Sequence, residues 1–314
     1  MQDLIDPIIG PLLLVLLLMW AGIGTLYLVL DRTEKAFEKG KRSPFPQEFL
    51  RGPGHSLYEK IEDLRLDFMG WLMGVMIMPA ILMAVPLSQA YLTGKRVSLG
   101  LWVMVAVVWI ATTVWLCRKA ITTFKTIRQL RLGYEGEVGV GQELNLLMLN
   151  GYRVYHDFPA QQFNIDHVVI GPAGVFAIET KARSKPVTGG GKRDATVVCH
   201  GDYLAFPNGS DYASIEQALR QARWLSQWLT RAVGEKVPVK AALVIPGWFV
   251  ERKKIGDVLV FNARESKNAI VGYRGAQLSA EMIQRIAHQV EEKCRDVAPK
   301  SYRDTNAHPA KPVP

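Results

Sequence analysis

Three long stretches of the sequence contain no charged residue: 7–30, 68–92 and 98–117. A helix needs roughly 20 apolar residues to cross the hydrocarbon core of a bilayer, so each stretch is long enough to span it. Pro79 and Pro86 interrupt the second stretch, but prolines are tolerated in a span where neighbouring groups satisfy the freed carbonyls. A single stretch of this kind would also suit a buried core helix. Three of them close together predict a membrane region of three helices.

The basic residues beside these stretches predict their orientation. Eight Lys and Arg residues lie in 31–67 and five in 118–132, whereas 1–6 contains none and 93–97 only two. Because basic flanks favour the cytoplasmic side, we expect a multi-pass protein of the cytoplasmic (inner) membrane with its N-terminus outside. Everything after Cys117 is then cytoplasmic, and 118–132 forms a basic helix at the lipid surface. The lipid bilayer is therefore one expected partner.

Overall charge and cysteine content say little about a ligand. The net charge is +9, but most of the excess lies beside the apolar stretches, where anionic lipid accounts for it. The region 133–297 is close to neutral. The three cysteines form no CxxC pair, which argues against a zinc knuckle and against a disulfide framework.

The second half of the sequence alternates helical and strand patterns. Helices are expected over 134–150, 214–233 and 278–297, and strands over 152–158, 165–170, 175–181, 197–205, 239–245 and 257–261. We therefore predict three parts: a membrane region over 1–132, a soluble domain over 133–297 and a disordered tail over 298–314. The soluble domain should be of the α/β (α+β) class with a central mixed sheet.

One pair of predicted strands brings polar residues together. The turn Gly171–Gly174 makes Ile170 pair with Val175, and counting back places Asp166 opposite Glu179. Because side chains alternate along a strand, the polar residues Asn164, Asp166, Glu179 and Lys181 should share one face. Ile165, Val169, Phe176 and Ile178 should then occupy the opposite, core-facing side.

Two opposed carboxylates repel each other unless a cation lies between them. Mg²⁺ suits two carboxylates together with water and a substrate phosphate. Lys181, two residues after Glu179, could then orient a water or stabilise charge on a phosphate. The alternative is a solvated charged face in which Lys181 forms an ordinary salt bridge with a carboxylate.

Three segments in order carry a family resemblance: Gly136-Glu137, then Ile165-Asp166-His167, then Gly174-Val175-Phe176-Ala177-Ile178-Glu179-Thr180-Lys181. The Asp-x12-Glu-x-Lys spacing resembles the PD-(D/E)xK nuclease superfamily, and the linked set resembles its nuclease-related domain, NERD. The resemblance covers roughly 133–261. It implies a restriction-endonuclease-like core, dependence on Mg²⁺ or Mn²⁺, and a phosphodiester substrate.

The resemblance also assigns roles to individual residues. Asp166 and Glu179 match the metal-binding carboxylates, Lys181 the catalytic lysine and Glu137 an acidic residue that many members bring to the metal. Gln217 matches a glutamine on the following helix. Asn164 stands where the family usually has Gln, and His167 is expected to be structural. Four basic residues after the site are candidates for phosphate contact: Arg183, Lys185, Lys192 and Arg193. Glu137 could equally be a helix-dipole residue, Gln217 a solvent-facing one, and the four a solvated basic loop.

The sequence therefore predicts a membrane-anchored, metal-dependent nuclease that acts on nucleic acid, DNA ahead of RNA, at the cytoplasmic membrane face. One alternative is a non-catalytic membrane-tethered module that binds nucleic acid or acts as a scaffold on a nuclease-like fold, since a fold does not define its chemistry. Another is that the membrane half works in a channel or secretion assembly. The absence of charged residues from the three stretches argues against ion transport.

Overall fold

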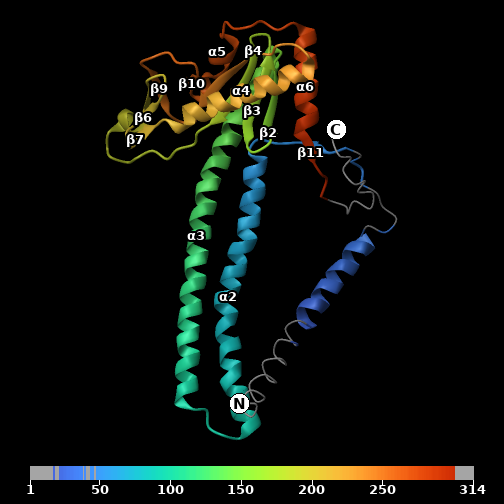
Figure 1. Ribbon diagram of the computed structural model, residues 1–314, viewed down its shortest axis with the longest axis vertical. Coiled ribbons are helices and arrows are strands. Elements are labelled where there is room, and N and C mark those ends of the chain that lie inside the picture. Colours follow the sequence, from blue (N-terminus) through green and yellow to red (C-terminus); the bar gives the residue numbers. More distant parts are fainter. Residues whose placement is uncertain (1–16, 18–20, 38, 40–42, 46, 301–314) are drawn as a thin grey trace. The chain divides into compact units, whose positions relative to one another are not determined.

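The computed structural model describes residues 17, 21–37, 39, 43–45 and 47–300 (Figure 1). They divide into two compact units. The helical unit contains the described residues up to 45 together with 62–127 and 299–300, and the sheet unit contains 47–61 together with 128–298. The division falls inside helices α2 (His55–Thr93) and α3 (Leu99–Asn145). Residues 21–37 are also helical.

In the helical unit, α2 and α3 run antiparallel (Figure 1). Trp71 packs edge-on against Trp115, with ring centroids 5.7 Å apart, and Gly74 lies against Leu116. Most of their other apolar side chains are exposed, which a core helix of a soluble protein would not show. Because no proline occurs between residues 99 and 150, the predicted helices 118–132 and 134–150 are parts of one continuous α3, followed by the 3-10 helix η1 (Leu146–Asn150).

Two helices in the described part of the chain are long and apolar enough to cross a membrane: His55–Thr93 and Leu99–Asn150. They contain the second and third of the predicted spans. The first predicted span, 7–30, lies mostly outside the described residues, and so does most of the tail 298–314. Two of the three expected membrane helices are therefore supported by length and composition.

The sheet unit is built on a five-stranded mixed sheet, as the sequence predicts. Its strands, in spatial order, are β10 (Leu259–Phe261), β8 (Val239–Val244), β4 (Gly174–Thr180), β3 (Asn164–Gly171) and β2 (Arg153–Pro159). Strands β2, β3 and β4 form an antiparallel meander, whereas β8 runs parallel to both β4 and β10.

Both faces of this sheet are covered by helices (Figure 1). On one face, α4 (Ala213–Val233) and α6 (Ala280–Cys294) bury a cluster that includes Val168, Leu225 and Ile286. On the other face, the end of α3, η1 and α5 (Ser266–Val271) pack near Val169 and Phe176. Each fully buried large apolar side chain contributes about 1.5–3 kcal/mol, so the two clusters hold the sheet between its helices.

The predicted register of the β3–β4 hairpin is confirmed, since Ile170 pairs with Val175 and His167 with Ile178. The predicted face of Ile165 is wrong, because Ile165 packs in the cluster with Val168 rather than with Val169. The β2–β3 ladder skips Asp157, whose φ of 49° lies in the left-handed region and breaks the regular alternation of faces.

A second, smaller sheet flanks the first. Its order is β7 (Gly209–Asp211), β6 (Leu204–Phe206), β5 (Thr196–Cys199) and β9 (Phe249–Arg252). The prediction of one strand over 197–205 is therefore wrong, because a turn closed by His200 N–H and the Tyr203 carbonyl splits it. The 3-10 helices η2 (Gly191–Ala195) and η3 (Ala263–Glu265) complete the connections.

The last predicted helix, 278–297, is shorter than expected. It ends at Cys294, and the chain continues as β11 (Arg295–Val297), which pairs with β1 (Phe49–Leu50). This pairing belongs to the sheet unit, so residues 47–61 pack with the domain that the sequence analysis begins at residue 133. The extra strand explains the difference, since it is too short to produce a periodic sequence pattern.

Candidate functional site

Asp166 and Glu179 lie at the open end of the β3–β4 hairpin, just beyond its last backbone pair, His167 with Ile178. The Thr180 N–H donates to Asp166 Oδ2 at 2.7 Å, so a side chain takes the place of a ladder acceptor there. Lys181 follows, and its backbone N–H donates to the Val244 carbonyl at 2.9 Å. The hairpin therefore brings both carboxylates and the lysine to one end of the sheet.

Two glutamines on α4 hold the Glu179 carboxylate. Gln217 Nε2 donates to Glu179 Oε1 at 2.7 Å, and Gln221 Nε2 donates to Glu179 Oε2 at 2.6 Å. Gln221 Nε2 also lies 3.3 Å from the Asn164 carbonyl oxygen. The structure thus places the predicted Gln217 at the carboxylate rather than in solvent. The sequence analysis missed Gln221, although its spacing of four from Gln217 indicates a shared helix face.

Glu137 reaches the same region from α3. It is buried, and its neighbour Gly136 packs so closely that an added Cβ would lie 2.5 Å from Ala182 Cβ. A residue without a side chain is therefore needed for the helix to approach the segment after β4. This close approach explains why a glycine precedes Glu137, and it brings the Glu137 carboxyl group toward Glu179.

Burial raises the pKa values of three acids at the site, and neighbouring carboxylates raise those of Glu137 and Asp166 further. Burial first, then the charges of Asp157 and Glu179, raise the pKa of Glu137 to about 8. Burial raises the pKa of Glu179 to about 7, against the opposing effects of Gln221, Lys181 and Gln217. The pKa of Asp166 is raised by burial and by the charges of Glu179 and Glu137. Carboxyl groups that hold protons near neutral pH mark a region with too little positive charge.

Within the described part of the chain, no group of three or more His, Cys, Asp or Glu side chains is gathered closely enough to hold a metal ion. Asp166 and Glu179 nevertheless offer hard oxygen donors, and Mg²⁺ is commonly held by only one or two carboxylates plus water and phosphate. The charge of Glu179 raises the pKa of Asp166, and a divalent cation would relieve this repulsion. The donor set therefore fits Mg²⁺ or Mn²⁺.

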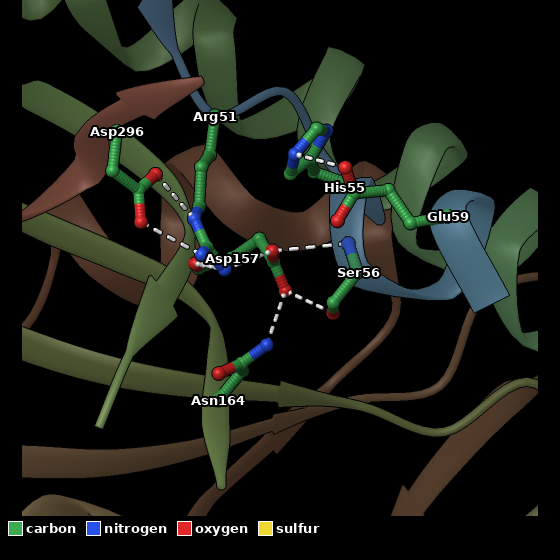
Figure 2. Close-up of polar contacts among 7 residues, drawn as sticks. All are labelled: Arg51, His55, Ser56, Glu59, Asp157, Asn164 and Asp296. Atoms are coloured by element: carbon green, nitrogen blue, oxygen red, sulfur yellow. Dashed lines mark hydrogen bonds and ion pairs between the residues drawn. The ribbon is translucent and has the colours of Figure 1, made fainter. Parts of the chain in front are cut away.

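A fourth acid, Asp157, is satisfied by the fold itself (Figure 2). It is only 1% exposed, and its Oδ2 accepts from Arg51 Nη1 at 2.9 Å and from the Ser56 N–H at 3.1 Å. Its Oδ1 accepts from Ser56 Oγ at 2.6 Å and from Asn164 Nδ2 at 3.1 Å. Arg51 in turn forms a two-pronged pair with Asp296. Residues 47–61 thus supply the counter-charge for Asp157.

His167 is structural, as expected. It is fully buried, and its Nδ1 lies 2.9 Å from Nδ1 of His156. The other ring nitrogen of His156 lies 3.0 Å from the Asn145 side-chain oxygen, which can only accept, so His156 Nε2 carries the proton. His167 must then donate to His156, and both rings are neutral. Burial lowers the pKa of both, to about 4 for His156.

The four candidate phosphate-contacting residues lie along the second sheet. The Arg183 guanidinium stacks over Phe206 at 4.3 Å, and Lys192 Nζ lies 5.1 Å from the Phe249 ring centroid. Lys185 Nζ is 6.0 Å from the Trp248 ring. Lys192 and Arg193 line an open groove of 920 Å³ that Phe206 also borders. The Arg183 guanidinium is thus stacked on an aromatic ring, whereas Lys185 and Lys192 lie near rings and remain exposed.

A mixed sheet that gathers Asp166, Glu179 and Lys181 at one end, under a helix with two glutamines, defines an α/β domain of nuclease-like architecture. Residues 132–246 match the family model of the nuclease-related domain, NERD. The match contains all of the predicted site residues and confirms the resemblance. No curated protein and no solved structure matches the chain.

Proposed function

We propose that this protein is a membrane-anchored, divalent-metal-dependent nuclease that hydrolyses phosphodiester bonds of nucleic acid, DNA ahead of RNA, at the cytoplasmic membrane face. One observation carries the proposal: Asp166 and Glu179 lie together at the end of a hairpin in the segment that matches the nuclease-related domain, and the charge of Glu179 adds to the burial that raises the pKa of Asp166. Carboxyl groups with raised pKa values are typical of functional sites, and this pair would bind a cation together with the substrate.

Asp166 and Glu179, with Glu137 beside them, would hold Mg²⁺ or Mn²⁺. The bound ion would supply positive charge to the phosphoryl oxygens and lower the pKa of a coordinated water. Gln217 and Gln221 fix the orientation of Glu179 through both of its oxygens. Lys181 would orient the attacking water or stabilise the charge that develops on the phosphate.

The basic residues would place the substrate backbone. Arg183 is stacked over Phe206, which holds its cationic group at a defined position, and Lys185 and Lys192 lie near aromatic rings with their side chains exposed. Arg193 borders the groove that Lys192 lines. Contacts of this kind hold phosphates without reading sequence, so we expect little sequence preference.

Two apolar helices support membrane anchoring. The excess of Lys and Arg in 31–67 and 118–132 supports an orientation with the nuclease-related domain in the cytoplasm. The substrate would then be nucleic acid that comes close to the inner face of the cytoplasmic membrane.

The test is cleavage by the purified full-length protein in detergent micelles. With Mg²⁺ or Mn²⁺ it should cut DNA or RNA, and Glu179→Gln should abolish cutting. Glu216→Gln is the matched control, since Glu216 is an exposed acid on α4, the helix that carries Gln217, and its side chain faces Arg220. Lys181→Ala should lower the rate roughly 100-fold or more while cation binding remains, the scale of losing one electrostatic stabiliser.

The rival is the non-catalytic module that binds nucleic acid or acts as a scaffold. It predicts no cleavage in the unmodified protein with either cation, and at most a modest, salt-dependent loss of nucleic-acid binding for Lys181→Ala. Metal-loaded protein that cuts neither DNA nor RNA, or that cuts equally well as Glu179→Gln, would refute the nuclease proposal.

A further inference from the structure

Three aromatic rings form a continuous stack at the start of α4. The His200 and Tyr203 rings are 4.7 Å apart with planes at 6°, and the Tyr203 and Tyr212 rings are 4.9 Å apart with planes at 24°. His200 and Tyr203 are the two ends of the β5–β6 turn, and Tyr212 is the N-cap residue of α4. The stacked rings therefore join the β5–β6 turn to the start of α4.

The outer ring of this stack is open to solvent. Tyr212 is 55% exposed although one face of its ring is covered by Tyr203, so the second face is free for contact. Hydrogen bonds of the neighbouring residue Asp211 fix the position of Tyr212. The Asp211 carboxylate accepts from the Ser214 N–H at 3.0 Å and from Ser214 Oγ at 2.8 Å, and Asp211 pairs with Leu204 in the sheet. A ring held in this way loses little entropy when a ligand stacks on it.

Basic side chains lie beside the stack. The N–H groups of Lys253 and Lys254 both point to the Cys199 carbonyl, at 3.0 and 3.4 Å, so this basic turn lies against the β5–β6 turn. The Lys254 side chain runs past Gly201. One exposed acid, Asp202, lies in the β5–β6 turn. The carboxylate of Asp211 instead accepts a hydrogen bond from Ser214 at the start of α4. An exposed aromatic ring, in a stack that begins at a turn packed against lysines, is the chemistry that recognises an unpaired base and its phosphate.

Helix α4 connects this stack to the candidate site. Tyr212 precedes Gln217 by five residues, which is about 7–8 Å along the helix axis, and Gln217 donates to Glu179. A base on the Tyr212 ring would therefore lie within a few nucleotides of the Asp166 and Glu179 carboxylates. In a continuous duplex the bases stack on one another, so their faces cannot reach the ring.

We propose that Tyr212 is a base-stacking platform that gives the protein a preference for single-stranded nucleic acid. This rests on the proposed function in that the ligand is nucleic acid, but it concerns binding and not cleavage. An experiment can therefore refute the base-stacking proposal without refuting the nuclease proposal, and the reverse. Lys253 and Lys254 hold the backbone of the same strand.

The experiment measures fluorescence anisotropy of a labelled oligo-dT and of a labelled duplex, with the full-length protein in micelles and EDTA present to prevent cutting. Tyr212→Ala should weaken oligo-dT binding roughly 5- to 100-fold, the range reported by removal of one stacking ring, and change duplex binding less than about twofold. Tyr212→Phe keeps the ring and should bind like the unmodified protein. Tyr212→Leu keeps apolar area without an aromatic face and should behave like Tyr212→Ala. Asp202→Asn should tighten oligo-dT binding.

Several outcomes would overturn the proposal: no binding of oligo-dT, an equal loss for duplex and single strand, or full binding by Tyr212→Leu. Unchanged thermal unfolding of each variant separates these outcomes from misfolding. If oligo-dT binding depends on the ring but no cation supports cleavage, the platform stands and the nuclease function fails. If cleavage occurs and Tyr212→Ala has the same strand preference, the nuclease function stands and the platform fails.

Discussion

Binding of a divalent cation at the carboxylates should release protons, and the structure gives the size of the effect. The pKa of Glu137 is raised to about 8 and that of Glu179 to about 7. At pH 7, Glu137 therefore carries about 0.9 proton and Glu179 about 0.5. A cation held among these groups favours their ionised forms, so these two groups should release about 1.4 protons at pH 7, and Asp166, whose pKa is also raised, would add to that release.

The same values set the pH dependence of the affinity. If cation binding requires Glu137 and Glu179 to be ionised, the apparent affinity for the cation should rise about 50-fold from pH 6 to pH 7. It should rise about 10-fold more from pH 7 to pH 8, and only about twofold from pH 8 to pH 9. The flattening above pH 8 reports the pKa of Glu137, which is the last of the two groups to ionise.

Isothermal titration calorimetry with Mg²⁺, in buffers of different ionisation enthalpy and without nucleic acid, counts the released protons directly. The full-length protein in micelles is used. Glu137→Gln removes one titrating group and should reduce the release at pH 7 by about 0.9 proton. Glu216→Gln is the exposed control and should leave it unchanged. An affinity that is constant from pH 6 to pH 9, with no proton release, would refute the idea that these acids receive the cation.

Three further outcomes are expected. Both His156 and His167 are neutral in the fold, and the folded pKa of His156 is depressed to about 4, so its contribution to stability is present above the unfolded value near 6.5 and is lost as pH falls toward 4. The deficit in unfolding free energy of His156→Asn should therefore shrink by about 2 kcal/mol from pH 7 to pH 5, and a constant deficit would contradict this. Arg51→Met should destabilise the protein by about 3–5 kcal/mol in denaturant unfolding because Asp157 is left buried without its cation, and adding Asp157→Asn should recover part of the loss. A reporter that is active only in the cytoplasm should work when fused after Lys300, and activity of only an exported reporter there would reverse the proposed orientation.

The part of the site that could be predicted from the sequence is the part built on local geometry. The turn Gly171–Gly174 sets the β3–β4 register, and the register brings Asp166 and Glu179 to one end of the hairpin. The helix over 214–233 follows from its amphipathic pattern, and a spacing of four on that helix would also have indicated Gln221. These features need only the strand and helix periods.

Contacts between distant segments could not be predicted in this way. Arg51 and Asp157 are 106 residues apart, and no periodic pattern relates them. Ile165 lies in the other core just beyond the point where the β2–β3 ladder lacks a pair, between His156–His167 and Phe158–Ile165, and regular alternation holds only while both strands stay in the ladder. Strands as short as β1 and β11 carry no pattern of their own, which is why residues 47–61 were assigned to the membrane region.

The contrast between Asp157 and its neighbours indicates where a cation is needed. Asp157 receives an arginine and hydrogen bonds from Ser56 and Asn164, so its charge is compensated inside the fold. Within the described residues, no Lys or Arg forms an ion pair with Glu137, Asp166 or Glu179, and the donors at Glu179 are neutral amides. Amides orient a carboxylate without neutralising it, and Lys181 only moderates the charge of Glu179. The fold therefore compensates Asp157 and, within the described residues, pairs none of the other three acids with a basic side chain, and we propose that a divalent ion with a phosphate ligand supplies this charge.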